Sequence, residues 1–274
     1  MNQINKETAF KEHILERKGC PIHYWLGGKG GRPLVVLTHG ACVDHRSFDR
    51  LAPLLTEKYR VLTWDVRGHG LSQPMGGEFS IPLAVEDLLA IMDELGEKKA
   101  LLVGHSNGSY IGQEMAFRHP EKVQAMVIAD GTCITWPRTA MEIKIVYGSN
   151  GLMKLLPFES LKTLGLPAFS AKKEVRDYVY NAFSMLDKAG YLEIWKGATA
   201  CLHPEAGYQI RQPVLLMHGE NDATGDIRKI APQWAAGLPN CRYEVIPNAS
   251  HMAPLDNPHR FNQLVMDFLA KWAK

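Results

Sequence analysis

The chain has 274 residues, 46% of them hydrophobic, and a formal net charge of +2. This length suits one large domain with an insertion, or two small domains. The near-neutral charge argues against a nucleic-acid surface and a polybasic membrane patch, so neither partner is expected. The first 19 residues contain no apolar core typical of a secretion signal, and the apolar runs are too short to cross a bilayer.

Cysteine usage indicates a reducing compartment. The five cysteines are odd in number, widely spaced and without a Cys-x-x-Cys pair: Cys20, Cys42, Cys133, Cys201 and Cys241. We therefore expect free thiols and a cytoplasmic protein. No histidine and cysteine cluster has metal-ligand spacing, and the glycine-rich stretches lack the dinucleotide-binding pattern. The sequence thus predicts no metal and no cofactor.

Strand-like and helix-like segments alternate through the first 131 residues. Residues 13–26 predict two short strands around a Lys18-Gly19 turn, and the apolar run at 34–38 is typical of a strand buried on both faces. Further strands are expected at 59–64, 100–103 and 123–129, with helices at 46–57, 85–92 and from 107 to Pro120. Asp44 is the expected N-cap of the first helix. This alternation predicts a mostly parallel sheet flanked by helices, an α/β fold.

Residues 132–207, the insert, interrupt this rhythm. The insert lacks a buried strand and carries helix-period segments, the clearest lying between Ser170, the expected N-cap, and Gly190. Alternation resumes with strands at 213–217 and 242–246 and ends in a helix capped by Asn257-Pro258. We therefore predict a core made of residues 1–131 and 208–274, with the insert as a helical lid over the carboxyl ends of the strands.

The stretch Gly104-His105-Ser106-Asn107-Gly108 lies between a predicted strand and a predicted helix. This is the nucleophile-elbow pattern, in which a strained turn lifts the serine hydroxyl clear of the backbone. Flanking glycines remove side chains that would collide with the neighbouring strand and helix. The pattern therefore makes Ser106 the candidate nucleophile.

Four further motifs follow predicted strands: His39-Gly40-Ala41, the stretch Asp65-Val66-Arg67-Gly68-His69-Gly70-Leu71-Ser72, Gly219-Glu220-Asn221-Asp222 and Ser250-His251. With the elbow, they occur in the order found in the α/β-hydrolase family, which the chain resembles from about residue 13 to its end. The insert follows the sixth predicted strand and looks like the cap of that family.

The resemblance implies a catalytic triad of Ser106, His251 and Asp222. The roles fit the chemistry, because a serine hydroxyl needs a base and histidine titrates near neutrality. A carboxylate on the other ring nitrogen fixes the tautomer and stabilises the imidazolium. Asp130 also follows a strand, and a few family members place the acid there, so the sequence leaves both carboxylates open.

The resemblance also implies an oxyanion hole formed by the backbone amides of Ala41 and Asn107. Cys42, Trp136 and Met252 are candidates for the substrate pocket, although a lone cysteine is more often simply small and buried. Within the insert, the following residues could line the pocket or form the insert's own core: Trp136, Met141, Ile145, Tyr147 and Phe158.

These features predict a serine hydrolase that cleaves a carboxylic ester, a lactone or a related acyl compound, with this small molecule as its partner. The serine at the elbow argues against the dehalogenase and epoxide-hydrolase branches, whose nucleophile in the family is an aspartate. Two alternatives stay open, since a fold does not fix a function. One is non-hydrolytic chemistry, as in a lyase or a cofactor-free oxygenase, and the other is a ligand receptor with little turnover.

Overall fold

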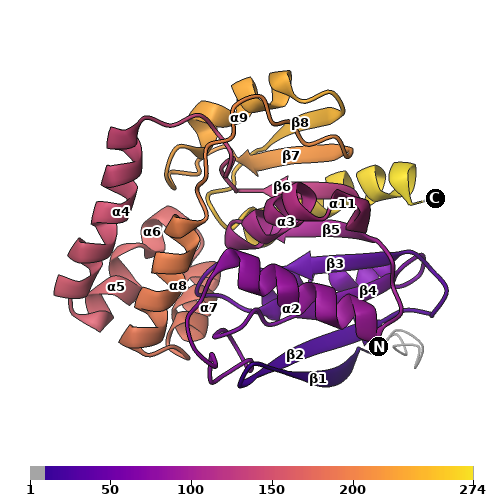
Figure 1. Cartoon of the computed structure of the whole chain (residues 1–274), viewed down its shortest axis with the longest axis horizontal. Coiled ribbons are helices and arrows are strands. Elements are labelled where there is room, and N and C mark those ends of the chain that lie inside the picture. Colours follow the sequence, from indigo (N-terminus) through magenta and orange to yellow (C-terminus); the bar gives the residue numbers. More distant parts are fainter. Residues whose placement is uncertain (1–9, 274) are drawn as a thin grey trace.

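The computed structural model describes residues 10–273, and the first nine residues of the N-terminal stretch interpreted above lie outside it. Within that range the strands form one sheet in the order β1-β2-β4-β3-β5-β6-β7-β8 (Figure 1). β1 pairs antiparallel with β2, β2 pairs antiparallel with β4, and every other neighbouring pair is parallel. The strands span Lys11–Arg17, Cys20–Gly27, Leu34–Thr38, Arg60–Trp64, Ala100–His105, Val123–Ala129, Val214–Gly219 and Cys241–Ile246. The predicted α/β architecture is confirmed.

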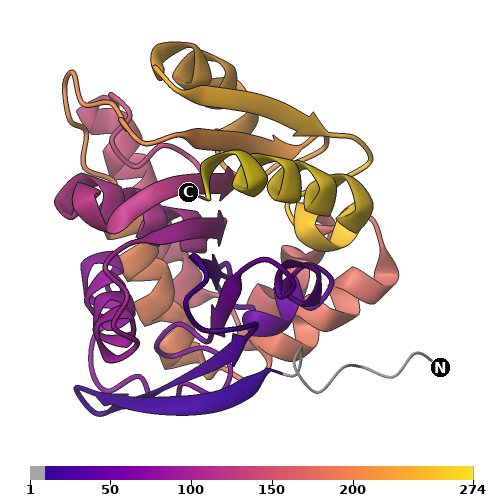
Figure 2. The same ribbon diagram turned by 90° about the vertical axis from the view of Figure 1, so that its right-hand side faces the viewer.

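Helices cover both faces of the sheet. Side chains of α2 (Ile81–Glu94), α3 (Asn107–Arg118) and α9 (Ile227–Gly237) pack with Val36 on one face. Side chains of α1 (Ala52–Leu55) and α11 (Pro258–Trp272) pack with Val35 and Leu37 on the other, and Figure 2 shows α11 lying across that face. All five residues of β3 are buried, as the unbroken apolar run predicts for a strand covered on both sides.

The insert is helical. It contains α4 (Ala140–Leu155), α5 (Phe158–Leu164), α6 (Leu166–Phe169), α7 (Lys173–Phe183) and α8 (Lys188–Ala200). These helices gather at the end of the sheet toward which the arrowheads of β3 and β7 point (Figure 1). That edge carries the predicted site, but the division into core and lid stays a prediction. Within residues 10–273, no helix combines the length and apolar character needed to span a bilayer.

Two predicted helices differ from the structure. The expected helix at 46–57 is a 3-10 helix (His45–Phe48) followed by α1, because Pro53 has no N–H to donate and is tolerated only in the first turn of a helix. Asp44 does cap the 3-10 helix, accepting a hydrogen bond from the Arg46 N–H at 3.0 Å. Ser170 does not cap α7, since the cap residue is Lys172, and α7 ends at Phe183, well before Gly190.

Candidate active site

Ser106 lies on a strained turn between β5 and α3. Its backbone has φ of 49° and ψ of −119°, a conformation that non-glycine residues rarely adopt. Its N–H donates to the Ala129 carbonyl at 2.8 Å, which fixes the turn against the end of β6. A Cβ on Gly108 would lie 2.1 Å from the Thr38 carbonyl oxygen, and a Cβ on Gly104 would lie 2.6 Å from the Gly108 oxygen. Close approach of the backbone therefore requires glycine on both sides of Ser106.

His251 connects Ser106 to Asp222. The Ser106 hydroxyl lies 2.9 Å from His251 Nε2, and His251 Nδ1 lies 3.0 Å from Asp222 Oδ2. The other carboxylate oxygen of Asp222 accepts the Thr224 N–H at 2.8 Å. Burial acts to raise the pKa of Asp222, but the hydrogen bond and charge of His251 outweigh it and hold that pKa below its usual range. An ionised Asp222 selects the tautomer with a proton on Nδ1, which leaves Nε2 free to accept the serine proton.

Asp130, the alternative acid, lies beside this chain of hydrogen bonds without joining it. Its Oδ1 accepts the Gly219 N–H at 2.7 Å, and its Oδ2 lies 3.7 Å from Nε2 of His105. Burial, and then the negative charge of Asp222, raise the pKa of Asp130 well above its usual range. The geometry thus gives Asp222, and not Asp130, to Nδ1 of His251. The catalytic roles themselves stay predictions.

His105 supports the backbone of His251. Its Nε2–H donates to the His251 carbonyl oxygen at 2.6 Å, which joins the elbow to the loop after β8. Burial, and next the charge of His251, lower the pKa of His105 to about 3, so its ring is neutral at physiological pH. These contacts give His105 a structural role between the elbow and the His251 loop.

The loop after β3 carries Ala41, the first candidate for an oxyanion-binding amide. His39 Nδ1 donates to the Gly40 carbonyl at 2.7 Å, and its Nε2 accepts the Val66 N–H at 3.0 Å. Because the carbonyl and the amide of a trans peptide point in opposite directions, the Ala41 N–H is directed away from His39. A Cβ on Gly40 would lie 3.1 Å from the Ser106 Cβ, so this loop lies directly against the candidate nucleophile.

Asn107 supplies the second candidate amide. It is the first residue of α3, where helical N–H groups have no partner within the helix and attract negative charge. The residue is buried beside Ser106.

Within residues 10–273, no group of three or more histidine, cysteine or acidic side chains could hold a metal ion.

Comparison with known proteins identifies the family. The sequence model of the Alpha/beta hydrolase family matches residues 35–264. The chain belongs to this family.

Individual relatives differ in chemistry. Epoxide hydrolase 3 of Xenopus tropicalis is 24% identical over 280 residues, covering 93% of this chain and 76% of the relative. The 1H-3-hydroxy-4-oxoquinoline 2,4-dioxygenase of Pseudomonas putida is 24% identical over 272 residues, covering 93% and 98%. Among solved structures, the enol-lactonase from Burkholderia xenovorans LB400 is similar with a TM-score of 0.82 and 24% identity, covering 94% and 100%. Membership of the α/β-hydrolase family therefore leaves the reaction open.

Two predicted pocket residues of this hydrolase are almost wholly buried. Cys42 is 6% exposed, adopts φ of 62° and has a thiol pKa raised by burial, so it is a poor nucleophile. Met252 has no exposed surface and packs with Val43 and Val179 beneath the insert. Both side chains thus belong to buried hydrophobic clusters, and a direct contact with substrate stays a prediction.

Trp136 faces another part of the α/β hydrolase. It lines a cavity of about 150 Å³ together with Tyr208 and Trp234, and none of Ser106, Asp222 and His251 lines this cavity. None of the three candidate catalytic residues shares this cavity with Trp136, and a contact of Trp136 with substrate stays a prediction.

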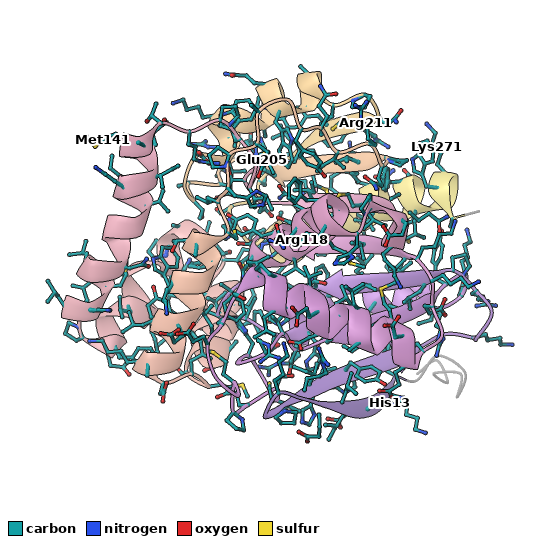
Figure 3. All side chains as sticks on the ribbon, viewed as in Figure 1. His13, Arg118, Met141, Glu205, Arg211 and Lys271 are labelled. Atoms are coloured by element: carbon teal, nitrogen blue, oxygen red, sulfur yellow. The ribbon has the colours of Figure 1, made fainter. Side chains whose placement is uncertain are left out.

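The other pocket candidates of the insert lie in different environments. Phe158 packs edge-on against Phe183, with 5.7 Å between ring centroids, as part of the insert's own core. Met141 and Ile145 are 66% and 67% exposed and belong to none of the three hydrophobic clusters of the described residues. Figure 3 shows Met141 at the outer rim, pointing away from the sheet. The side chain of Tyr147 lies outside the described part of the chain.

Sequence reasoning missed two insert residues at the site. The Phe169 ring, at the end of α6, stands edge-on to the His251 ring, with 5.5 Å between centroids. The Tyr178 hydroxyl, on α7, donates to Asp44 Oδ1 at 3.1 Å, next to the loop that carries Ala41. Helical periodicity predicts which face of a helix is buried, but it does not predict which loop of the core that face contacts.

Proposed function

We propose that this α/β hydrolase is a serine hydrolase that cleaves a carboxylic ester or lactone through an acyl-enzyme on Ser106. The observation that carries the proposal is the continuous line of hydrogen bonds from the Ser106 hydroxyl through His251 to Asp222, with Ser106 raised on a left-handed turn. A serine at this position also favours acyl transfer over the epoxide opening named for one relative.

In the proposed mechanism, Ser106 Oγ attacks the substrate carbonyl carbon as its proton passes to His251 Nε2. Asp222 stabilises the resulting imidazolium, and the amides of Ala41 and Asn107 donate to the oxyanion. The C–O bond to the leaving alcohol then breaks, and His251 returns the proton to that oxygen. His251 next removes a proton from water, which attacks the acyl carbon. The bond from that carbon to Ser106 Oγ then breaks, His251 returns the proton to Oγ, and the acid leaves. In a lactone, the alcohol stays attached to the acyl group.

The expected partner is this small-molecule ester or lactone. The name of the enol-lactonase, a structural neighbour, fits this substrate class. The free state of all five cysteines agrees with the cytoplasmic location expected from the sequence, which we retain as a proposal.

One relative supports a second candidate function. The dioxygenase of Pseudomonas putida is similar over almost its whole length, and its name describes oxygen chemistry. In that case His251 would remove a proton from the substrate, and Ser106 would not be acylated. Oxygen uptake without release of an alcohol from any ester would favour this alternative.

The test is covalent labelling and turnover. The purified protein should release chromophore from short-chain aryl esters, and an aryl phosphonate should add once, with peptide mass analysis placing the adduct on Ser106. Ser106→Ala should lower kcat by about three powers of ten or more, leaving only the oxyanion hole and binding. Labelling of another serine, or ester turnover that survives in Ser106→Ala, contradicts the proposal.

A further inference from the structure

A short stretch of the insert lies along the loop that carries His251. Besides the contact of the Phe169 ring with the His251 ring, the Phe169 carbonyl accepts the Met252 N–H at 3.0 Å. Lys172 reaches the same loop and donates from Nζ to the Asp256 carbonyl at 2.6 Å. The insert therefore contacts the loop after β8 at the His251 ring and bonds to it at Met252 and Asp256, which both follow the histidine.

One buried carboxylate forms the centre of this attachment. Asp256 Oδ2 accepts the Ser250 N–H at 2.7 Å, immediately before His251, while Oδ1 accepts the Ser170 hydroxyl of the insert. Ser170 has no exposed surface and Asp256 is 4% exposed, so water does not replace either partner. The Ser170 oxygen also accepts the Lys172 N–H at 2.9 Å, which holds the hydroxyl hydrogen toward Asp256.

Removal of one partner from such a pair is costly. A buried carboxylate that loses a donor keeps its desolvation penalty, so the neighbouring backbone shifts to recover a hydrogen bond. Here the neighbouring backbone belongs to Ser250 and His251. A shift of about 1 Å in a catalytic group can cost on the order of a hundredfold in rate.

A second hydroxyl–carboxylate contact joins the insert to the core elsewhere. The Thr132 hydroxyl donates to Asp226 Oδ1 at 2.6 Å, and Arg138 pairs with the same carboxylate at 3.2 Å. Neither residue contacts Ser106, His251 or Asp222 among the hydrogen bonds of the described chain. Thr132 therefore provides a matched control of the same chemistry outside the hydrogen bonds that join Ser106, His251 and Asp222.

We propose that Ser170 and Asp256 are positioning residues, which join the insert to the His251 loop and hold the imidazole between the edge of Phe169 and Asp222. This inference rests on the proposed function of Ser106 and His251. It makes α6 and the start of α7 part of the catalytic framework, so that this part of the insert and His251 move together.

The experiment compares Ser170→Ala, the conservative Asp256→Asn and the control Thr132→Val with the parent chain on one aryl ester. Ser170→Ala should lower kcat about tenfold or more with KM changed less than about threefold, and should displace the acidic limb of the kcat/KM profile. Asp256→Asn can still accept from Ser250 and donate to the Ser170 oxygen, so it should stay within about threefold of the parent. Thr132→Val should leave kcat and the profile unchanged.

Each outcome decides the inference. An unchanged kcat and pH profile in Ser170→Ala overturns it, even where the melting temperature falls. If Ser170→Ala does not fold, folded Asp256→Ala is measured instead. A loss of kcat of about tenfold that Asp256→Asn restores to within about threefold of the parent supports the inference, and an unchanged kcat in Asp256→Ala overturns it. If the parent chain cleaves no ester, the proposed function fails, and amide hydrogen exchange then tests the attachment by itself. Faster exchange at Ser250 and Met252 in Ser170→Ala, but not in Thr132→Val, supports the attachment. Equal exchange in the two variants overturns it.

Discussion

Replacing Asp222 by asparagine tests how His251 is oriented. One carboxylate oxygen accepts the Thr224 N–H at 2.8 Å, and the other faces His251 Nδ1 at 3.0 Å. Asparagine has a single acceptor oxygen, and the Thr224 amide can only donate. The carbonyl oxygen of the introduced side chain therefore takes the place next to Thr224, and its NH₂ group faces His251.

The expected loss is large because the imidazole tautomer reverses. An NH₂ group can only donate, so Nδ1 of His251 becomes the acceptor and the proton moves to Nε2. The serine proton then has no base to receive it. Such a reversal can lower kcat by about four powers of ten, which corresponds to about 5 kcal/mol of transition-state stabilisation.

Asp130→Asn is the matched control, assayed on the same aryl ester. Burial raises the pKa of Asp130, and an amide resembles the neutral acid in shape and keeps an oxygen for the Gly219 N–H. We expect a loss of kcat below about tenfold. Both variants should stay folded by circular dichroism. A larger loss from Asp130→Asn than from a folded Asp222→Asn would refute the assignment of Asp222.

The remaining predictions concern stability. Gly108→Ala should lower the free energy of unfolding in urea by about 3 kcal/mol, because its Cβ would meet the Thr38 carbonyl oxygen at 2.1 Å. Gly148→Ala is the control: this residue lies in α4 with open space around it, so the substitution should raise that free energy by up to about 1 kcal/mol. Equal effects would contradict this account of the elbow. Burial acts to raise the pKa of Asp44, but Arg46 outweighs it and lowers that pKa. The pair of Asp44 and Arg46 therefore stabilises the fold above about pH 4, and this stability is lost as pH falls through the lowered pKa. In Asp44→Asn the free energy of unfolding should fall less steeply as the pH is lowered. An unchanged pH dependence would argue against a role for the pair.

Local sequence patterns were sufficient to predict the sheet and to place Ser106, Asp222 and His251 at one of its edges. Continuous apolar runs predicted the buried strands, and the motifs at their ends placed Ser106, Asp222 and His251 at one edge, where the structure brings them within hydrogen-bond distance. The choice between Asp130 and Asp222 was not available from spacing, because both follow parallel strands. It depends on the Thr224 and Gly219 amides, which turn the two carboxylates in different directions.

The insert shows the limit of sequence patterns. Ser170 has the residue type and position of an N-cap, yet its hydroxyl bonds to Asp256, 86 residues further along the chain. The tertiary partner takes the hydroxyl hydrogen while the oxygen still accepts the Lys172 N–H at 2.9 Å, and no local pattern showed that Asp256 would be this partner. Phe169 reads equally well as insert core, but the fold places it against His251.

The two carboxylates near His251 have opposite protonation preferences because the fold gives them different partners. Like charges so close cannot both be stable in a buried site, so one must bind a proton unless cations compensate. The imidazole of His251 and the Thr224 N–H lower the pKa of Asp222 and so favour its charged form. Burial and the charge of Asp222 raise the pKa of Asp130 by more than its backbone donors lower it. A raised pKa at Asp130 disfavours a second anion beside Asp222, so in the proposed mechanism the imidazolium would pair with Asp222. The chain after β7 thus supplies the carboxylate that faces His251, and the chain after β6 supplies a second carboxyl group, which accepts the Gly219 N–H and has a raised pKa.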